Sequence, residues 1–308
     1  MARPGAGAGA TAFVIVPLPP ASAVAFADTR HGWVGSAHGL LGTSDGRTFR
    51  IETRSAIIGI SAFDRARAWA ISGDGFVLRT SDGRRWSRLG VPHLLRMQFV
   101  DALVGFGVTR DSVLVRSDDS GKSWRQARAP GPVRSECFTT RRDGWVARGG
   151  SVWTTHDGGQ RWARARLGAG PQELPDLGCR NGDVWAVFHE GAAAGTEGYH
   201  VFRSLAGGSW RPVLASPFQR KLPSISNYAG PFSVLGRGGA VFTGSCAPCG
   251  SGTATLVRTR NGGASFTRST RRGPPATAVD FLDNRRGWIV AGRRLLRTVD
   301  GGRHWRVP

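Results

Sequence analysis

Seven copies of one short turn motif divide this chain of 308 residues into units of similar length. Each copy has a Ser or Thr, an acidic position one or two residues later, a glycine and a closing aromatic residue. The closing aromatics are Phe49, Trp86, Trp124, Trp162, Trp210, Phe266 and Trp305. The first four and the last pair are spaced by 37 to 39 residues. A period of about 40 residues is that of a four-stranded propeller blade.

A second aromatic residue precedes each closing one within a short apolar run. The seven upstream residues are Trp33, Trp69, Phe106, Trp145, Trp185, Phe242 and Trp288. Two aromatic positions in register across seven units predict an all-β fold. We expect a seven-bladed β-propeller of four-stranded antiparallel blades. The two longer spacings, before Trp210 and Phe266, predict insertions in blades five and six.

The acidic position of the motif predicts a turn between the third and fourth strands of each blade. It is occupied by Asp45, Asp82, Asp119, Asp157, Ala206, Asn261 and Asp300. An Asp side chain can accept backbone N–H bonds across such a turn, and glycine adopts positive φ without strain. We therefore expect these Asp-box residues and their closing aromatics to be structural rather than catalytic.

The repeat covers residues 22–308, which we expect to form one propeller domain. The predicted blades are 22–54, 56–90, 94–130, 133–168, 174–216, 222–270 and 275–308. Residues 1–21 have two interpretations. They are the remnant of a leader peptide, or they hold a short β-prone run, Phe13 to Val16, that pairs beside the short last strand and closes the ring.

With these motifs the chain resembles the BNR or Asp-box repeat propellers. It is most similar to the photosystem II stability/assembly factor-like group and distantly similar to sialidases. The first resemblance implies a rigid disc that holds another protein. The second implies a Tyr nucleophile, for which only Tyr199 and Tyr228 are available, and an early Arg-Ile-Pro stretch. Here Arg50-Ile51 is followed by Glu52, which weakens the sialidase interpretation.

Propeller topology places the two insertions on the face opposite the Asp boxes. They run from His189 to Tyr199 and from Gly244 to Thr255. Extended loops on a rigid scaffold are a common place for recognition. The candidate binding residues are His189, Glu190, Glu197 and Tyr199.

The chain is strongly basic, with 42 Lys and Arg residues against 21 Asp and Glu residues. On the Asp-box face we expect a ring of arginines from the turns between the first and second strands. Its members are Arg30, Arg65, Arg67, Arg141, Arg142, Arg285 and Arg286. This ring is a candidate surface for an anionic partner. The alternative is a solvated rim in a protein whose arginine content follows the base composition of its genome.

Four cysteines permit three pairings. Cys246 and Cys249 are separated by two residues, and we expect them to clamp their loop as a disulfide. Cys137 and Cys179 lie in the predicted first strands of adjacent blades, where they form a disulfide or stay as buried thiols. Two disulfides indicate an oxidising compartment.

Together these features predict a non-catalytic interaction scaffold that binds a protein or glycan partner at the cell envelope, outside the cytoplasm. Two alternatives remain: a sialidase-like or other glycan-active hydrolase, and a polyanion-binding propeller. We expect a monomer with no cofactor and no metal. No apolar run is long enough for a membrane-spanning helix.

Overall fold

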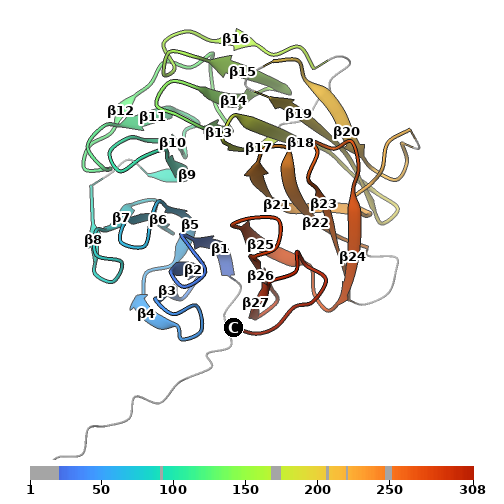
Figure 1. Cartoon of the computed structure of the whole chain (residues 1–308). Helices are drawn as coiled ribbons and strands as arrows, with labels where there is room; N and C mark the ends of the chain where they lie inside the picture. The colour runs from blue at the N-terminus through green and yellow to red at the C-terminus, as the bar shows by residue number, and fades with distance from the viewer. Residues whose placement is uncertain (1–20, 91–92, 168–174, 206–207, 220, 247–251) are drawn as a thin grey trace, which may run out of the picture.

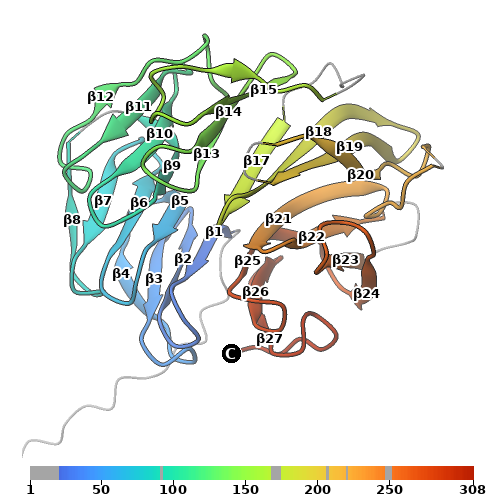
Figure 2. The ribbon, with the colours of Figure 1, turned by 45° about the horizontal axis from the view of Figure 1, so that its top comes forward.

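A computed structural model describes residues 21–90, 93–167, 175–205, 208–219, 221–246 and 252–308. Its strands form seven antiparallel sheets around a central axis, which confirms the predicted seven-bladed propeller (Figure 1). Six sheets have four strands and the seventh has three. The ring turned by 45° shows the first blade, which begins with β1, beside the last, which begins with β25 (Figure 2).

The strands of each blade follow one another from the axis to the rim. The innermost strands are β1 (Ala21–Phe26), β5 (Ile57–Ala62), β9 (Leu94–Phe99), β13 (Ser135–Phe138), β17 (Pro175–Arg180), β21 (Tyr228–Gly236) and β25 (Ala276–Phe281). The second strands are β2 (Gly32–Ser36), β6 (Ala68–Ser72), β10 (Gly105–Thr109), β14 (Gly144–Arg148), β18 (Asp183–Ala193), β22 (Gly239–Ser245) and β26 (Gly287–Ala291). The third strands are β3 (Gly39–Thr43), β7 (Val77–Thr80), β11 (Leu114–Ser117), β15 (Ser151–Thr155), β19 (Thr196–Leu205), β23 (Thr253–Thr259) and β27 (Arg294–Thr298). The outer strands are β4 (Arg50–Thr53), β8 (Trp86–Arg88), β12 (Arg125–Gln126), β16 (Ala163–Arg164), β20 (Arg211–Ala215) and β24 (Thr267–Arg272).

The seventh blade lacks a full outer strand. Its place is taken by one isolated bridge, in which Arg297 and Arg306 exchange two backbone hydrogen bonds of 2.7 and 2.9 Å. The short last strand expected from the sequence is thus reduced to a single pair. The closing strand expected at Phe13 to Val16 lies outside the described residues.

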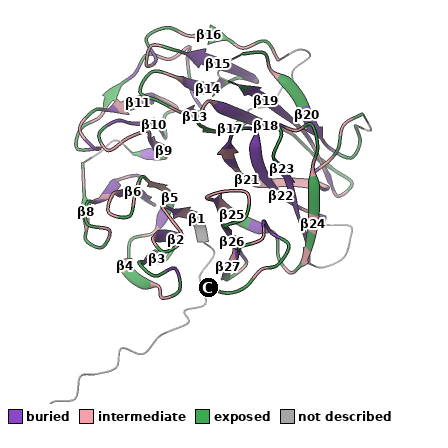
Figure 3. Cartoon of the chain, in the orientation of Figure 1, coloured by how far each residue is buried: buried purple, intermediate pink, exposed green. Residues whose placement is uncertain are grey.

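The upstream aromatics form the centre of each blade. All seven lie in the second strands and are fully buried, whereas outer strands such as β4 and β24 carry much of the exposed surface (Figure 3). The closing aromatics are partly buried against the same clusters. The two aromatic positions seen in the sequence are therefore the inner and outer parts of the hydrophobic core.

Steric contact explains why glycine precedes four of these buried aromatics. A phenylalanine at the end of the innermost strand lies over that glycine in the same blade. A Cβ atom at the glycine would come closer than 3.0 Å to the phenylalanine ring. The four pairs are Gly32 with Phe26, Gly105 with Phe99, Gly144 with Phe138, and Gly287 with Phe281.

The same phenylalanines join neighbouring blades by ring stacking. Phe26 stacks on Trp288 at 3.7 Å, and Phe99 stacks on Trp69 at 3.6 Å between ring centroids. Phe138 stacks on the upstream aromatic of blade three at 3.5 Å. In each case the ring reaches back to the preceding blade. These stacks add attraction beyond the apolar area that the rings bury.

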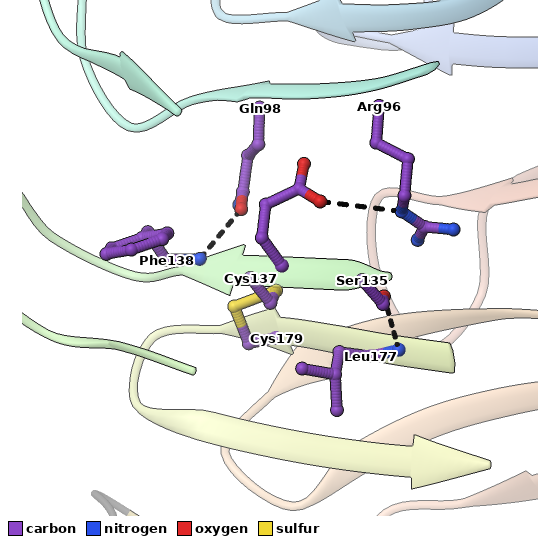
Figure 4. Close-up of a disulfide and its surroundings, with 8 residues drawn as sticks. Arg96, Gln98, Ser135, Cys137, Phe138, Leu177 and Cys179 are labelled. Atoms are coloured by element: carbon purple, nitrogen blue, oxygen red, sulfur yellow. Dashed lines mark hydrogen bonds and ion pairs between the residues drawn. A yellow bond between two sulfur atoms is a disulfide. The ribbon is translucent and has the colours of Figure 1, made fainter. Parts of the chain in front are cut away.

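A recurring polar contact also joins the innermost strands of successive blades. One side chain accepts a hydrogen bond from a backbone N–H in the next blade. The pairs, at 2.7 to 3.1 Å, are Ser61 with Phe99, Gln98 with Phe138, Ser233 with Phe281, and Asp280 with Phe26. Between blades four and five, the Cys137–Cys179 disulfide occupies this register position, since Cys137 has the same register as Gln98, and Ser135 Oγ accepts a hydrogen bond from Leu177 N–H at 3.0 Å beside it (Figure 4).

The Asp-box residues lie in the turns between third and fourth strands. Asp45 Oδ1 accepts hydrogen bonds from the backbone N–H groups of Arg47 and Thr48, and Thr43 Oγ1 accepts one from Gly46. The same acceptor role recurs at Asp82, Asp119, Asp157, Asn261 and Asp300. The N–H donors hold the pKa of Asp45 far below its usual range. In the fifth copy, Ala206 at this position lies outside the described residues, while Ser204 Oγ donates a hydrogen bond to Gly208 O at 2.8 Å.

Candidate functional site

The antiparallel blades sort the connections onto two faces of the ring. The box face carries the Asp-box turns and the turns between first and second strands. The link face carries the hairpins between second and third strands and the connections from blade to blade. The first predicted insertion lies on the link face, where β18 and β19 form a long hairpin with an irregular register after His189. The second belongs to the link-face connection between β22 and β23, and its residues 247–251 lie outside the described residues.

The clearest polar cluster on the link face is centred on His189. Its Nδ1 donates a hydrogen bond to Glu197 Oε1 at 2.6 Å, and its Nε2 lies 3.7 Å from Asp176 Oδ2. These two carboxylates raise the pKa of His189 to about 9, against the opposing effect of burial. His189 is therefore a cation at neutral pH. The other oxygen of Glu197 accepts the backbone N–H of Ala229 at 2.8 Å, which ties the hairpin to blade six.

The cluster continues to blades three and four through Arg96. Arg96 Nη1 donates to Asp176 Oδ1 at 3.2 Å, and Arg96 Nε lies 3.6 Å from Glu136 Oε2. The Arg96 side chain thus joins innermost strands of three different blades at the link-face end of the ring. Figure 4 shows its contact to the side chain on β13. We call the five residues Arg96, Glu136, Asp176, His189 and Glu197 the link-face network.

Glu136 is the buried member of the link-face network. Its side chain is 2% exposed, and Oε2 has no hydrogen-bond partner. Burial raises the pKa of Glu136 to about 7, against the attraction of Arg96. Asp176 is the opposite case, because nearby His189 and Arg96 lower its pKa. Asp176 is half-exposed and stays ionised at neutral pH.

Two of the four predicted binding residues lie outside this network. Glu190 pairs instead with His200 on the same hairpin. Tyr199 is fully buried, and its hydroxyl donates to Ser226 O at 2.9 Å and accepts from Ile225 N at 2.8 Å. The prediction of Tyr199 as a binding residue is therefore wrong. Its phenol satisfies backbone groups of the link to blade six, and burial raises its pKa.

Exposed apolar side chains also lie on the link face. Leu95, next to Arg96 in β9, is 45% exposed, and Ile58 in the neighbouring innermost strand β5 is 36% exposed. Phe218, in the connection from β20 to β21, is 64% exposed. The link face therefore offers both apolar area and fixed charges.

The predicted basic ring is interrupted by ion pairs. Its seven arginines all lie in the turns between first and second strands, as their positions between the strands show. Three of them are paired, each at 2.5 Å: Arg67 with Asp64, Arg141 with Asp101, and Arg286 with Asp283. Arg30, Arg65, Arg142 and Arg285 are exposed. Acidic residues of the same turns thus alternate with the arginines around the box face.

The four cysteines follow the expected pairing as far as they are described. Cys137 and Cys179 form a disulfide with a Cα–Cα distance of 5.8 Å. Cys246 is disulfide-bonded, while its expected partner Cys249 lies outside the described residues. Among the described residues, no group of three or more His, Cys, Asp or Glu side chains could hold a metal ion. The same part of the chain contains no helix that could cross a membrane.

Sequence reasoning missed Arg96, Glu136 and Asp176. All three lie in innermost strands, at the second or third position from the link face. A signal was present, since charged residues are unusual in otherwise apolar strands, but the sequence does not show which of them meet. Arg96 and Asp176 are 80 residues apart, and the closed ring brings them together.

Comparison with family models and with curated proteins found no match. Solved structures do match. A GH74 enzyme of Niastella koreensis superposes with a TM-score of 0.72 at 14% identity, covering 92% of this chain and 52% of the enzyme. This chain therefore spans about half the length of that enzyme.

Two further similar structures differ in size from each other. YCF48 bound to D1 peptide superposes with a TM-score of 0.63 at 17% identity, covering 92% of this chain and 95% of YCF48. PorZ, a bacterial surface component of the type-IX secretion system of Porphyromonas gingivalis, gives 0.66 at 11% identity over 94% of this chain and 38% of PorZ. At these identities the likeness establishes the propeller fold. Assembly-factor and glycosidase propellers, the two expected groups, are both among the similar structures.

Proposed function

We propose that this chain is a non-catalytic scaffold that binds a segment of a partner protein on its link face. The observation that carries the proposal is the link-face network. Arg96, Asp176 and His189 hold each other in place and remain partly exposed, between 30 and 52%. Side chains fixed before binding lose little entropy when a partner arrives.

The surroundings of the network suit a peptide. Leu95 and Ile58 supply exposed apolar area beside Arg96, and the β18–β19 hairpin projects from the same face. Apolar anchors surrounded by polar groups are typical of protein–protein interfaces. The similar fold of YCF48 has been captured with a peptide, which supports this mode of binding.

The same proposal places the protein at the cell envelope. PorZ and an extracellular domain of Bacteroides thetaiotaomicron are similar in fold. The Cys137–Cys179 disulfide supports an oxidising compartment, because cytosolic thiols are normally kept reduced.

Hydrolysis of a glycan is the competing function, and the GH74 likeness favours it. Retaining and inverting glycosidases need two carboxyl groups that reach the same substrate bond. In the link-face network, however, Glu136 is buried and both oxygens of Glu197 are engaged. Tyr199 is also buried and cannot act as a nucleophile. These contacts favour the scaffold.

The test is a selection from a displayed random-peptide library, followed by affinity measurements with Asp176→Asn. Loss of this carboxylate removes one partner from Arg96 and one from His189. We expect selected peptides to bind about tenfold more weakly, the size of one lost charge-assisted contact. Asp74→Asn is the matched control, because Asp74 is also a link-face carboxylate paired with an arginine, Arg88, at 2.8 Å.

The same proteins are assayed with fluorogenic glycosides. Turnover that disappears in Asp176→Asn but not in Asp74→Asn would replace the scaffold by a hydrolase. Selected peptides that bind equally to both variants would move the binding surface away from the network.

A further inference from the structure

The outer strands of the blades carry much of the positive charge of this protein. The six outer strands contain eight arginines and one acid, Glu52. The arginines are Arg50, Arg88, Arg125, Arg164, Arg211, Arg268, Arg271 and Arg272. Other arginines are interior, since Arg116, Arg203 and Arg258 lie beneath the first box glycine of the next blade. The outer wall of the ring is therefore basic, unlike the box face, where acids alternate with arginines.

In blades two and three the arginines of the outer wall have counter-ions. Arg88 pairs with Asp74 at 2.8 Å, and Arg125 pairs with Asp118 at 2.9 Å. All four side chains are exposed, by 43 to 64%. The charge of this part of the wall is therefore compensated on the spot.

Blade six presents three arginines in one outer strand, β24. Arg268 donates to the carbonyl of Ile225 at 2.8 Å, and Arg271 donates to the carbonyl of Arg272 at 2.9 Å. The Arg272 side chain is exposed, and none of the three arginines forms an ion pair with another described residue. A carbonyl orients a guanidinium group but does not neutralise it. Blade six therefore carries uncompensated positive charge on its outer wall.

This charge continues around the ring into blades seven and one. Figure 1 shows β24, β27 and β4 following one another along the rim. Arg294 in β27, Arg306 beside β27 and Arg50 in β4 are all exposed, and within the described ranges none of them forms an ion pair. The carboxyl of Glu52 lies against Gly42 of its own blade, where a Cβ would come within 3.0 Å of it. We call the six residues Arg50, Arg268, Arg271, Arg272, Arg294 and Arg306 the basic wall.

Two exposed aliphatic side chains lie beside arginines of the basic wall. The position two residues after the closing aromatic is Ile51 in blade one and Val307 in blade seven, and these side chains are 55% and 58% exposed. Each directly follows an arginine, Arg50 or Arg306. The other five blades have Arg88, Gln126, Arg164, Pro212 and Arg268 at this position. An arginine followed by an exposed aliphatic residue is thus specific to two neighbouring blades.

Ile51 is exposed because blade seven has no full outer strand. Ile51 is the partner of Leu41 in the ladder between β3 and β4, so the two side chains lie on the same face of the sheet. Leu41 packs against the cluster that contains Trp288 and Leu295 of blade seven. Ile51 therefore faces blade seven at the rim, where a single bridge at Arg306 replaces the outer strand.

We propose that the basic wall, with Ile51 and Val307, docks on the surface of an anionic lipid bilayer. Lipid headgroups spread negative charge over a plane, so arginines from three neighbouring blades can approach it together. Aliphatic side chains among them enter the boundary between headgroups and acyl chains. Ile51 and Val307 stand singly among arginines, whereas a protein interface has a contiguous apolar centre. The basic wall is separate from the link-face network, and the proposal does not depend on the proposed function.

The test is co-sedimentation of the full chain with phosphatidylcholine vesicles that contain or lack phosphatidylglycerol, at low and at physiological salt. We expect binding to the mixed vesicles only, and weaker binding at the higher salt. Arg272→Gln with Arg294→Gln should weaken binding about 30-fold, because each arginine near an anionic bilayer contributes about fivefold. Both side chains are exposed, so the variant should fold.

The aliphatic residues are tested by Ile51→Ser with Val307→Ser. This variant should bind the mixed vesicles about tenfold more weakly, because two partly buried aliphatic groups are lost. Its binding should keep the salt dependence of the wild type, since no charge is changed. Binding equal to that of the wild type would contradict insertion of these side chains and thus the proposed docking surface.

Arg65→Gln with Arg142→Gln is the matched control for the arginines. Both are exposed arginines of the box face, and the variant lowers the net charge by the same amount as Arg272→Gln with Arg294→Gln. Equal losses in the two double variants would show that binding follows net charge alone and would overturn the proposal.

The wild type is also mixed with soluble poly-glutamate. Binding to poly-glutamate but not to mixed vesicles, lost in Arg272→Gln with Arg294→Gln, would assign the basic wall to an acidic protein in place of a membrane. A wild type that binds neither vesicle would likewise overturn the proposal.

Discussion

The contact between blades four and five and the contact between blades seven and one have the same geometry but different chemistry. At the first, Cys137 of β13 is covalently bonded to Cys179 of β17. At the second, Asp280 of β25 accepts a hydrogen bond of 2.7 Å from the backbone N–H of Phe26 in β1. The first contact lies within the chain, whereas the second closes the ring between its first and last blades.

This difference shows where the ring depends on packing alone. The closing contact has no covalent bond, and blade seven has only the Arg297–Arg306 bridge in place of an outer strand. The contact is held by an apolar cluster that includes the Phe26–Trp288 stack, together with the hydrogen bond from Phe26 N–H to the buried Asp280. We therefore expect the closing contact to open at lower free energy than the disulfide-bonded one. Local openings of this kind are measured by amide hydrogen exchange.

The largest effect is expected for Phe26→Ala. It removes a buried ring that packs on Trp288 and leaves a cavity at the closing contact. The free energy of unfolding should fall by about 3–5 kcal/mol, as for other buried phenylalanines. Urea denaturation measures it, with the 39% exposed Phe63→Ala as control. Equal losses in both variants would contradict a closing contact held by stacking.

Removal of the disulfide should have the next largest effect. The two cysteines are 42 residues apart, and a cross-link of that span stabilises a fold by about 2–4 kcal/mol. Cys137→Ala with Cys179→Ala should therefore unfold at a lower urea concentration. Hydrogen exchange should then become similar at the two contacts. Protection of β13 and β17 that stays unchanged would show that packing alone suffices there.

Glu136→Gln tests the buried carboxyl beside the disulfide. Because its pKa is about 7 in the fold and 4.5 when unperturbed, folding favours its protonated form. Its contribution is thus fully present below pH 4.5 and is lost as pH rises through 7. Glu136→Gln should be more stable than wild type at alkaline pH, by about 3 kcal/mol, and equal to it in acid. Thermal unfolding across this pH range measures the difference, and a constant offset would contradict it.

At the closing contact we expect a slightly smaller loss of folding stability with rising pH. Burial raises the pKa of Asp280 to about 6 from 3.8, so its contribution is lost as pH rises between these values. Asp280→Asn keeps an oxygen for the Phe26 N–H and should remove about 3 kcal/mol of that pH dependence. The measurement that separates the two variants is the pH range over which stability changes, because the range for Asp280 lies below that for Glu136. Identical windows for the two variants would mean that one shared group titrates.

Much of the fold could be predicted because the repeat is local. The turn bonds of residues such as Asp45 and Asp300 span three or four positions, so they are written in consecutive residues. The site was predicted only in part. His189 and Glu197 were found because both lie on one insertion, but Tyr199 was misjudged, since its burial depends on the link to blade six.

The sequence by itself determined the number of blades, the turns and the buried aromatics, because each depends on a period of one blade or less. Only the tertiary structure decided which side chains meet between blades. Arg96 reaches Asp176 two blades away, and Arg258 lies under the box of the next blade. These contacts depend on the closed ring, which brings together residues that are far apart in the sequence. No local sequence pattern therefore indicates which of them meet.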